Sequence, residues 1–580
     1  MASAEDGDVS NHSKILIIGA GMAGLNTAHI LTKCGLTDFK ILEARNRVGG
    51  RIVSVDMEHH KVELGANVIH GVLGNPTYEL AMANSLVDIV QTPKPHNVVA
   101  ATEEGKQVPF DILQEMFEAY GCFLHRCEEY FLSQYAPPDG VNSVGEHIAL
   151  EVALYLERIT NNEERRIRQA IFDCLLKRET CISGCNSMDE IDLLEIGSYV
   201  ELQGGNIPIP SGYSAILRPV LSIIPEDKIL KRHAVSKIIW HGTQQSSVSN
   251  GGLSTVSSES SLVGSNSGAD TVSEDSDDSD KTVTGEPPPG SNNSLSDFNP
   301  VKVVCENGAV FTADHVVVTI PLGVLKDRHT SLFEPALPQS KSKAIGRLLF
   351  GTVDKILLEY DRPFLNPDVT EVMLLWNNED EMGTFGAGPG SHVDLGDMSQ
   401  RWFRKIYSFS KISETLLLGF ISGKEAEYME TLPFDRVAEK CTELLRRFLS
   451  DPFVPRPKMC ICTSWKNQKY TQGSYTAIAV GASQADIETI AQPLYYDQLH
   501  RTPSVLFAGE HTHPSFYSTV HGAYLSGQRV AQTLKKVLLN IDDDLERKVR
   551  KMENCSSSKI AQSEERESML SSWVEGISLE

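Results

Sequence analysis

The sequence predicts an α/β protein with two domains: one contains a parallel sheet assembled from separate segments of the chain, and the other is α+β. Three observations support this prediction. The chain has 580 residues, which is too many for a single compact core. A glycine-rich turn joins an apolar run to a helical stretch near the N-terminus, and a second apolar run followed by a glycine and a helical stretch stands near the C-terminus.

The N-terminal segment has the order of a Rossmann-like dinucleotide-binding unit. The β-branched run Ile15–Ile18 predicts a buried strand, and a helix is expected to follow to about Lys33. Between them, Gly19 permits the tight turn, Gly21 lets the backbone approach a pyrophosphate, and Gly24 lets the helix pack close to the strand. The N-terminus of the helix then offers free N–H groups to the phosphates.

The next residues favour FAD over NAD. A second predicted strand, Phe39–Leu42, ends in Glu43, where a carboxylate can accept hydrogen bonds from ribose hydroxyls. Two further glycines then stand beside Arg51, and a guanidinium suits bidentate binding of phosphate. An extended FAD molecule needs such a second backbone contact more than NAD does, so we expect FAD.

Charge and composition exclude several classes. The formal net charge is −24, which argues against a nucleic-acid-binding protein and favours the attraction of cations. The first dozen residues are polar and acidic, so no secretory signal is evident. No apolar run is long enough to span a bilayer, and the C-terminal residues do not form a peroxisomal signal. The 11 cysteines lack zinc-type spacing, so we expect reduced thiols, no metal and a cytoplasmic protein, with nuclear entry left open.

The rest of the chain divides by composition. Two long periodic stretches, Phe110–Phe131 and Val144–Leu176, predict helices, and the Ser-, Asp- and Gly-rich segment 241–300 predicts a disordered acidic insertion between two strands. The expected segments are a disordered N-terminus at 1–13, FAD-binding parts at 14–90, 206–330 and 491–540, substrate-domain parts at 91–205 (helical) and 331–490, and a charged flexible tail at 541–580.

A second strand–turn–helix stands near the C-terminus. The run Leu506–Ala508 leads into Gly509 and Glu510, and a helix is predicted to begin at Gly522. Its N-terminus could hold another part of the same cofactor. With the N-terminal segment, this arrangement resembles the flavin-containing amine oxidases, and within them the polyamine oxidases, over roughly residues 14 to 535 apart from the acidic insertion.

This resemblance implies roles for particular residues. Lys355 matches the family lysine that holds a water near the flavin, and His70 matches a histidine at the catalytic tunnel. Ser474 stands where monoamine oxidases have the cysteine that bonds FAD, so noncovalent FAD is expected. The residues implied to bind FAD are Gly19, Gly21, Ala23, Gly24, Glu43, Ala44, Arg45, Gly50, Arg51, Val235, Glu510, Thr519 and Val520. The residues implied to bind substrate are His70, Glu201, Ser474, Tyr475 and Thr519.

The implied activity is oxidation of spermine or an N1-acetylated polyamine by O₂, which gives a shorter polyamine, an aminoaldehyde and H₂O₂. The implied protein is a monomer that binds neither nucleic acid nor membrane. Val68 and Ala477 depart from the family pattern, because relatives have a tryptophan and a tyrosine at these places, and this leaves the exact polyamine open. Two alternatives remain: a histone-lysine demethylase-like amine oxidase, and a non-catalytic FAD-bound regulatory protein.

Overall fold

A computed structural model describes residues 11–58, 60–87, 97–240, 300–377, 395–497 and 502–539. Most of the predicted N-terminal segment 1–13, the insertion 241–300 apart from Pro300, and the tail 541–580 lie outside the described residues. Residues 11–13 are described, and here the prediction was wrong. His12 and Ser13 belong to the first strand, because they pair with Thr312 and Ala313.

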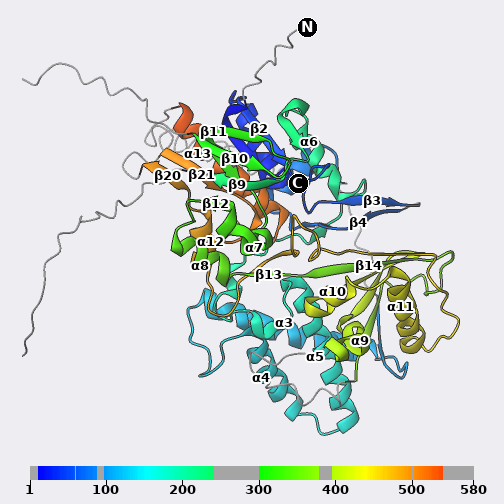
Figure 1. The fold of residues 1–580 in the computed structure, drawn as a ribbon. Coiled ribbons are helices and arrows are strands. Elements are labelled where there is room, and N and C mark those ends of the chain that lie inside the picture. Colours follow the sequence, from blue (N-terminus) through cyan, green and yellow to red (C-terminus); the bar gives the residue numbers. More distant parts are fainter. Residues whose placement is uncertain are drawn as a thin grey trace, which may run out of the picture. The chain divides into compact units, whose positions relative to one another are not determined.

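A nine-stranded sheet forms one half of the described structure, with the order β12-β9-β10-β11-β1-β2-β8 (Figure 1). In addition, β21 pairs with β11, and β20 pairs with β21. Strands β2, β1, β11 and β21 run parallel to one another. Its strands are β1 (His12–Ile18), β2 (Phe39–Glu43), β8 (Ile229–Lys231), β9 (Val235–Ile239), β10 (Val301–Cys305), β11 (Val310–Val318), β12 (Phe333–Glu334), β20 (Leu494–Asp497) and β21 (Thr502–Phe507). The sheet therefore joins segments from both ends of the chain, as the sequence predicts.

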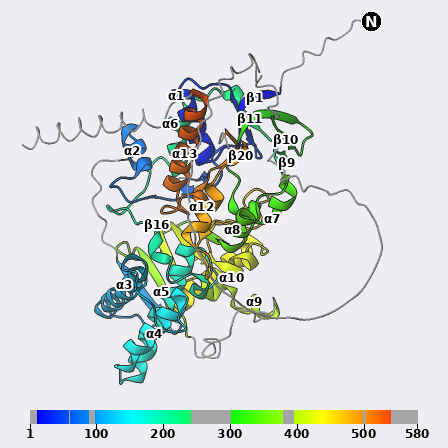
Figure 2. The same ribbon diagram turned by 90° about the vertical axis from the view of Figure 1, so that its left-hand side faces the viewer.

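Helices α1 (Met22–Lys33) and α13 (Val520–Leu539) pack side by side on this sheet (Figure 2). Their approach is close: a Cβ at Gly527 would lie 2.3 Å from the carbonyl oxygen of Ala23. The Asn26 side chain donates a hydrogen bond to the Tyr524 carbonyl at 2.7 Å. These contacts bring the two predicted strand–turn–helix units together.

A six-stranded sheet forms the other half, with the order β18-β14-β17-β16-β15-β6. Its strands are β6 (Val98–Thr102), β14 (Val353–Glu359), β15 (Glu371–Leu375), β16 (Ser408–Ser413), β17 (Leu416–Ser422) and β18 (Met459–Cys462). Helices α3 (Phe110–Leu132), α4 (Val144–Glu157) and α5 (Asn162–Ser183) share one core with Met373, whereas α11 (Phe434–Phe448) shares another with the adjacent Val372. Because neighbouring residues of a strand point to opposite faces, helices cover both faces of this sheet.

Shorter elements complete the described chain. They are β3 (Ser54–Met57), β4 (His60–Glu63), β5 (Ile69–His70), β7 (Asn206–Ile207), β13 (Leu349–Gly351), β19 (Tyr475–Ala477), α2 (Pro76–Ala83), α6 (Leu217–Leu221), α7 (Leu322–Leu332), α8 (Gln339–Arg347), α9 (Leu395–Arg401), α10 (Gly423–Met429) and α12 (Gln484–Ala491). Within the described ranges, no helix combines the length and the apolar character needed to cross a bilayer.

The α/β class predicted from the sequence is confirmed, although some segments lie elsewhere than expected. Strand β12 pairs with β9, and α8 and α12 pack together against the nine-stranded sheet, although the sequence placed residues 331–490 in the second domain. The apolar side chains of these segments complete the core beside β9–β11, which explains their position. The region expected to be helical also contains β6, which joins the six-stranded sheet through β15.

Candidate active site

A cavity of about 1200 Å³ extends from the carboxyl ends of β1 and β2 to strand β14. Apart from Gly24, every site residue expected from the sequence lines it. These residues are Gly19, Gly21, Ala23, Glu43, Ala44, Arg45, Gly50, Arg51, His70, Glu201, Val235, Lys355, Ser474, Tyr475, Glu510, Thr519 and Val520. Residues from distant parts of the sequence therefore meet around one space.

The glycine-rich turns form a backbone cradle at one end of this cavity. Gly21 forms a bridge with Gly49, and the Gly49 N–H donates to the Ala20 carbonyl at 2.7 Å. A Cβ at Gly21 would have no heavy atom within 4 Å, so the cavity side of this residue is open. Gly24 faces the other way, where a Cβ would lie 2.0 Å from the Gly19 carbonyl oxygen. Gly24 thus acts through helix–strand packing rather than by contact with a ligand.

Glu43 ends β2 and is almost fully buried beside the cradle. Its carboxylate accepts hydrogen bonds from the backbone N–H groups of Ala20 and Arg45, each at 2.8 Å. A carboxylate has lone pairs for further donors, so these bonds hold Glu43 in place and leave it able to accept ribose hydroxyls. The Arg45 side chain donates to Thr471 Oγ1 at 2.6 Å.

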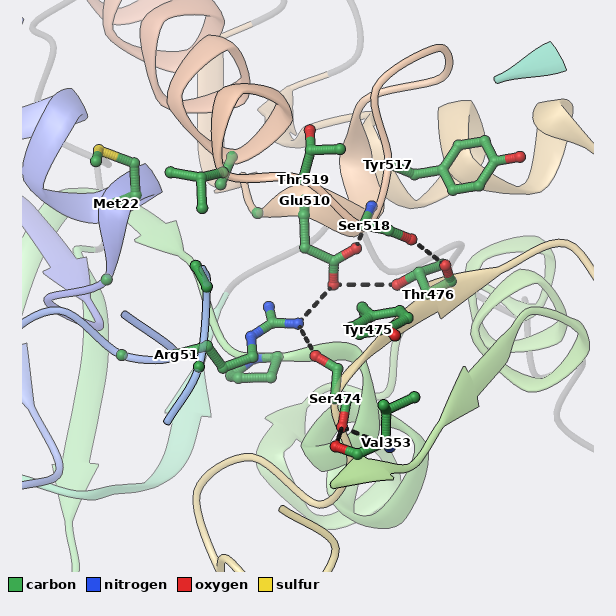
Figure 3. Close-up of a pocket in the computed structure, with 18 of the residues that line it drawn as sticks. Met22, Arg51, Val353, Ser474, Tyr475, Thr476, Glu510, Tyr517, Ser518 and Thr519 are labelled. Carbon is green, nitrogen blue, oxygen red and sulfur yellow. Dashed lines mark hydrogen bonds and ion pairs between the residues drawn. The ribbon is translucent and has the colours of Figure 1, made fainter. Parts of the chain in front are cut away.

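Arg51 and Glu510 form an ion pair in the cavity wall, in which Glu510 is buried and Arg51 is partly buried (Figure 3). Arg51 Nη1 donates to Glu510 Oε1 at 3.0 Å and to the Ser474 carbonyl at 2.7 Å. Burial alone would raise the pKa of Glu510, but the nearby Arg51 charge, His511 and the N–H of Ser518 outweigh it, so this pKa lies below its ordinary value. The pair stays charged and ties the cradle to the C-terminal segment.

Thr519 and Val520 stand at the N-terminus of α13. Thr519 Oγ1 accepts a hydrogen bond from the Gly522 N–H at 2.9 Å and donates to the Phe516 carbonyl at 2.7 Å. Thr519 therefore caps the helix, and its hydroxyl is engaged within the chain. Val235 lines the far part of the cavity from β9.

These features fit an extended dinucleotide such as FAD. The open side of Gly21 gives the backbone access that a pyrophosphate needs, and the N-termini of α1 and α13 both face the cavity. Glu43 supplies an acceptor, while Arg51 supplies a positive charge. The volume is ample for a cofactor together with a slender substrate.

Lys355 reaches the cavity from β14 and is 6% exposed. Its Nζ donates to the carbonyls of Glu63 at 2.8 Å and Gly65 at 2.7 Å, and lies 3.4 Å from Asn67 Oδ1. Burial lowers the pKa of Lys355 to about 8, although the Glu63 charge acts in the opposite direction. The contact with Asn67 is the longest and hence the easiest to exchange for a water.

His70 lines the cavity from β5. Its Nδ1 lies 3.0 Å from Oδ1 of Asn206 on the paired strand β7. Because a carboxamide oxygen only accepts, Nδ1 carries a proton and Nε2 is the free acceptor of the neutral ring. Burial lowers the pKa of His70, whereas the bond to Asn206 and the Glu201 charge partly offset this. At neutral pH the ring is therefore ready to accept a proton.

Besides Glu43 and Glu510, the carboxylates of Glu128, Glu179 and Glu201 line the cavity. Glu201 is exposed, while Glu179 on α5 is partly buried. Burial raises the pKa of Glu179 to about 7, although nearby Arg178 lowers it. Within the described residues, Glu179 has no hydrogen bond or ion pair. Glu179 was not predicted as a site residue, because an acidic residue on a helix normally indicates a solvated face. Asn206 and Asn67 were not predicted either.

Ser474 and Tyr475 were expected to bind substrate, but their hydroxyls are engaged elsewhere. Ser474 Oγ accepts from the N–H of Val353 and donates to the Val353 carbonyl, both at 2.9 Å (Figure 3). Tyr475 donates its hydroxyl to the Cys181 carbonyl, and burial raises its pKa well above the ordinary value. The geometry gives Ser474 a structural role and leaves only the Tyr475 ring to face the cavity.

The chain is similar to a known protein family and to several named proteins. The family model described as flavin containing amine oxidoreductase matches residues 22–252 and 293–535. The human protein named peroxisomal N(1)-acetyl-spermine/spermidine oxidase is 32% identical over 91% of this chain and 96% of its own length. A rice protein named polyamine oxidase 1 is 27% identical over 91% of this chain and 98% of its own. A Drosophila melanogaster protein named possible lysine-specific histone demethylase 1 is 27% identical over 89% of this chain but only 62% of its own length.

Proposed function

Since the chain belongs to the family of flavin-containing amine oxidoreductases, with FAD as its cofactor, we propose that it is a polyamine oxidase. Its substrate is spermine or an N1-acetylated polyamine, and O₂ is the electron acceptor. The products are a shorter polyamine, an aminoaldehyde and H₂O₂. The polyamine oxidases among its relatives support this substrate class.

The observation that carries the proposal is that the cradle shares one cavity with Lys355, which is desolvated, with neutral His70, and with three further carboxylates. Bound flavin supplies the electron sink for removing hydride from the carbon beside the amine nitrogen. A polyamine carries several ammonium groups, so its remote charges require anionic partners. Glu179 and Glu201 are suited to bind them, and ionisation of Glu179 becomes more favourable when an ammonium adds its positive charge to that of Arg178.

His70 is suited to prepare the reacting nitrogen. Asn206 fixes its tautomer, so Nε2 can take a proton from the substrate ammonium and leave the neutral amine that hydride removal requires. Lys355 is held by two backbone carbonyls, which aim its ammonium at a defined point in the cavity. From there it can hold a water by giving up its contact with Asn67.

The FAD is noncovalent in this proposal. The position at which monoamine oxidases carry a bonding cysteine is Ser474, and its hydroxyl is engaged with Val353. The predicted cytoplasmic location, the monomeric state and the absence of nucleic-acid binding stay predictions from the sequence.

Anaerobic stopped-flow absorbance tests the proposal. The flavin-loaded protein is mixed separately with spermine, spermidine and their N1-acetyl forms, and the flavin band is followed. We expect at least one of these amines to bleach the band at a saturable rate, and readmitted O₂ to restore it with release of H₂O₂. A band that persists with all of them would refute the proposal, and a band bleached only by a methylated-lysine peptide would support a demethylase instead.

A further inference from the structure

Three cysteines gather on one face of the six-stranded sheet. Cys460 and Cys462 belong to β18, and Cys441 of α11 shares a core with them. The Sγ atoms of Cys460 and Cys462 lie 3.8 Å apart, within the range of a thiol hydrogen bond. Cys462 and Cys441 are buried, whereas Cys460 is partly exposed. Cys460 is therefore the more accessible residue of the close pair.

Strand β18 lies at the edge of its sheet and pairs only with β14, in the strand order of the described residues. Cys462 stands opposite Ile356, and Cys460 stands opposite Leu358. An edge strand can change its local geometry without breaking a second ladder. The two cysteines, two residues apart, point to the same face.

We propose that Cys460 and Cys462 form a peroxide-sensitive dithiol, which H₂O₂ converts into a disulfide within β18. The Cys460 thiolate attacks one oxygen of the peroxide, and with one proton this gives a sulfenic acid and water. The Cys462 sulfur then attacks the sulfenic sulfur, so that the S–S bond forms and a second water leaves. Overall two thiols lose two electrons and two protons, and one H₂O₂ becomes two waters. The inference rests on the proposed function for its internal source of peroxide.

The two thiols have different parts in this reaction. The hydrogen bond with Cys460, together with burial, raises the pKa of Cys462 well above its ordinary value. Cys462 therefore keeps its proton and can donate it toward the neighbouring sulfur. Cys460 is the thiol that peroxide reaches, and Cys462 is the one that resolves the sulfenic acid. Burial likewise raises the pKa of Cys441, and this thiol is fully buried, so peroxide does not reach it directly.

The disulfide would act on the cavity through the next residue, Thr463. The backbone N–H of Lys355 donates to Thr463 Oγ1 at 2.8 Å, and this hydroxyl donates to Asp354 at 2.7 Å. Residues two apart in a strand have Cα atoms roughly 6.7 Å apart, near the upper limit for a disulfide. Forming the bond must therefore shorten β18 locally and shift Thr463. Lys355 would move with it, which links oxidation to turnover.

The test uses the reduced, flavin-loaded protein and two sources of peroxide. In one arm H₂O₂ is added and then removed with catalase; in the other the amine substrate is turned over with or without catalase. Trypsin cleaves after Lys458 and Lys466, so one peptide carries both cysteines. We expect this peptide to lose about 2 Da, and kcat to fall about tenfold. A thiol reductant should restore both.

Variants identify the residues. Cys460→Ser and Cys462→Ser should each abolish the mass loss and the reversible fall in kcat, while Cys122→Ser, which removes an exposed thiol on α3, should change neither. Sulfinic acid at Cys460, a bond to Cys441, or no reaction with added peroxide would overturn the proposal. The added-peroxide arm needs no turnover. If added peroxide forms the disulfide but no polyamine yields peroxide, the peroxide-sensitive dithiol is supported and the proposed polyamine oxidase activity is refuted.

Discussion

The cavity has two ends that are built in different ways. At the cradle, backbone groups and a charged pair make the surface, and Arg51 and Glu510 neutralise each other at 3.0 Å. The other end, which we call the amine end, is lined by Lys355, His70 and Glu179. Nearby opposite charges do not fully offset the burial of Lys355 and Glu179, so the pKa of Lys355 falls to about 8 and that of Glu179 rises to about 7. The cradle is therefore arranged for fixed binding, whereas the amine end keeps groups that exchange protons near neutral pH.

Removing the Arg51–Glu510 ion pair should have the largest effect on stability and on FAD retention. It tests whether this pair holds the cradle together. Arg51→Ala leaves the buried Glu510 carboxylate without its counter-charge, so we expect the free energy of unfolding to fall by about 3 kcal/mol and FAD to be lost on gel filtration. Chemical denaturation and the flavin absorbance of the purified protein measure both. Arg436→Ala, which breaks an exposed pair with Glu439, should cost at most about 0.5 kcal/mol.

The pH dependence of the same variant gives an independent check. The pKa of Glu510 is lowered in the folded protein, so its contribution to stability is present at neutral pH and is lost as the pH falls through the folded pKa. Arg51→Ala should therefore lose less stability than the parent between neutral and acid pH. Equal acid sensitivity of the two proteins would contradict the charged pair.

Lys355→Met should affect the amine end while sparing the cradle. We expect FAD content to stay normal and kcat to fall about 100-fold, because the ammonium held by two carbonyls is lost. The parent should show a step in its pH–rate profile near pH 8, the pKa of Lys355, and the variant should lack it. Lys326→Met is a matched control, since the ammonium of Lys326 is likewise held by backbone carbonyls, three in its case, but lies outside the cavity lining. An equal fall in kcat for both variants would show that Lys355 acts through stability alone.

The two ends also differ in how far the sequence predicted them. Gly24 could be assigned to helix–strand packing because the spacing of the glycines fixes the local backbone, and the 2.0 Å approach of a Cβ to Gly19 agrees with that assignment. Glu510 and Arg51 were expected at the cofactor, but their pairing depends on how distant segments meet. The sequence carried no signal for that contact.

The residues of the amine end were predicted only through family resemblance, and the predicted set was incomplete. Glu179 lies on a helix that contains both charged and apolar residues, and its burial arises only when α5 packs beside the cavity. Strand β6 was missed for a similar reason. Its residues Val98–Thr102 show no alternation of apolar and polar side chains, since helices cover both faces of the sheet.

Glu179→Gln should have a smaller effect that depends on pH. Since the pKa of Glu179 is about 7, the carboxylate is mostly ionised at pH 8 and mostly neutral at pH 6. We expect KM for a polyamine to rise about tenfold at pH 8, as for loss of one charge-assisted bond, and to change little at pH 6. Steady-state kinetics at both pH values measures this, with Glu129→Gln as the control, because Glu129 lies on α3 outside the cavity lining and binds Ser133. A change in KM that is equal at both pH values would contradict an ionised Glu179 as the ammonium partner.

The smallest effect is expected for Ser474→Ala, which decides between the structural role and the predicted contact with substrate. The Ser474 hydroxyl accepts one hydrogen bond from the backbone of Val353 and donates its only proton to that backbone, which holds it in the wall. Its loss should lower the free energy of unfolding by about 1 kcal/mol and leave KM unchanged, because the carbonyl that binds Arg51 belongs to the backbone. A several-fold rise in KM with unchanged stability would return Ser474 to the substrate site. It would also show that substrate reaches the part of the cavity wall beside Arg51, which the contacts of Ser474 assign to the cradle.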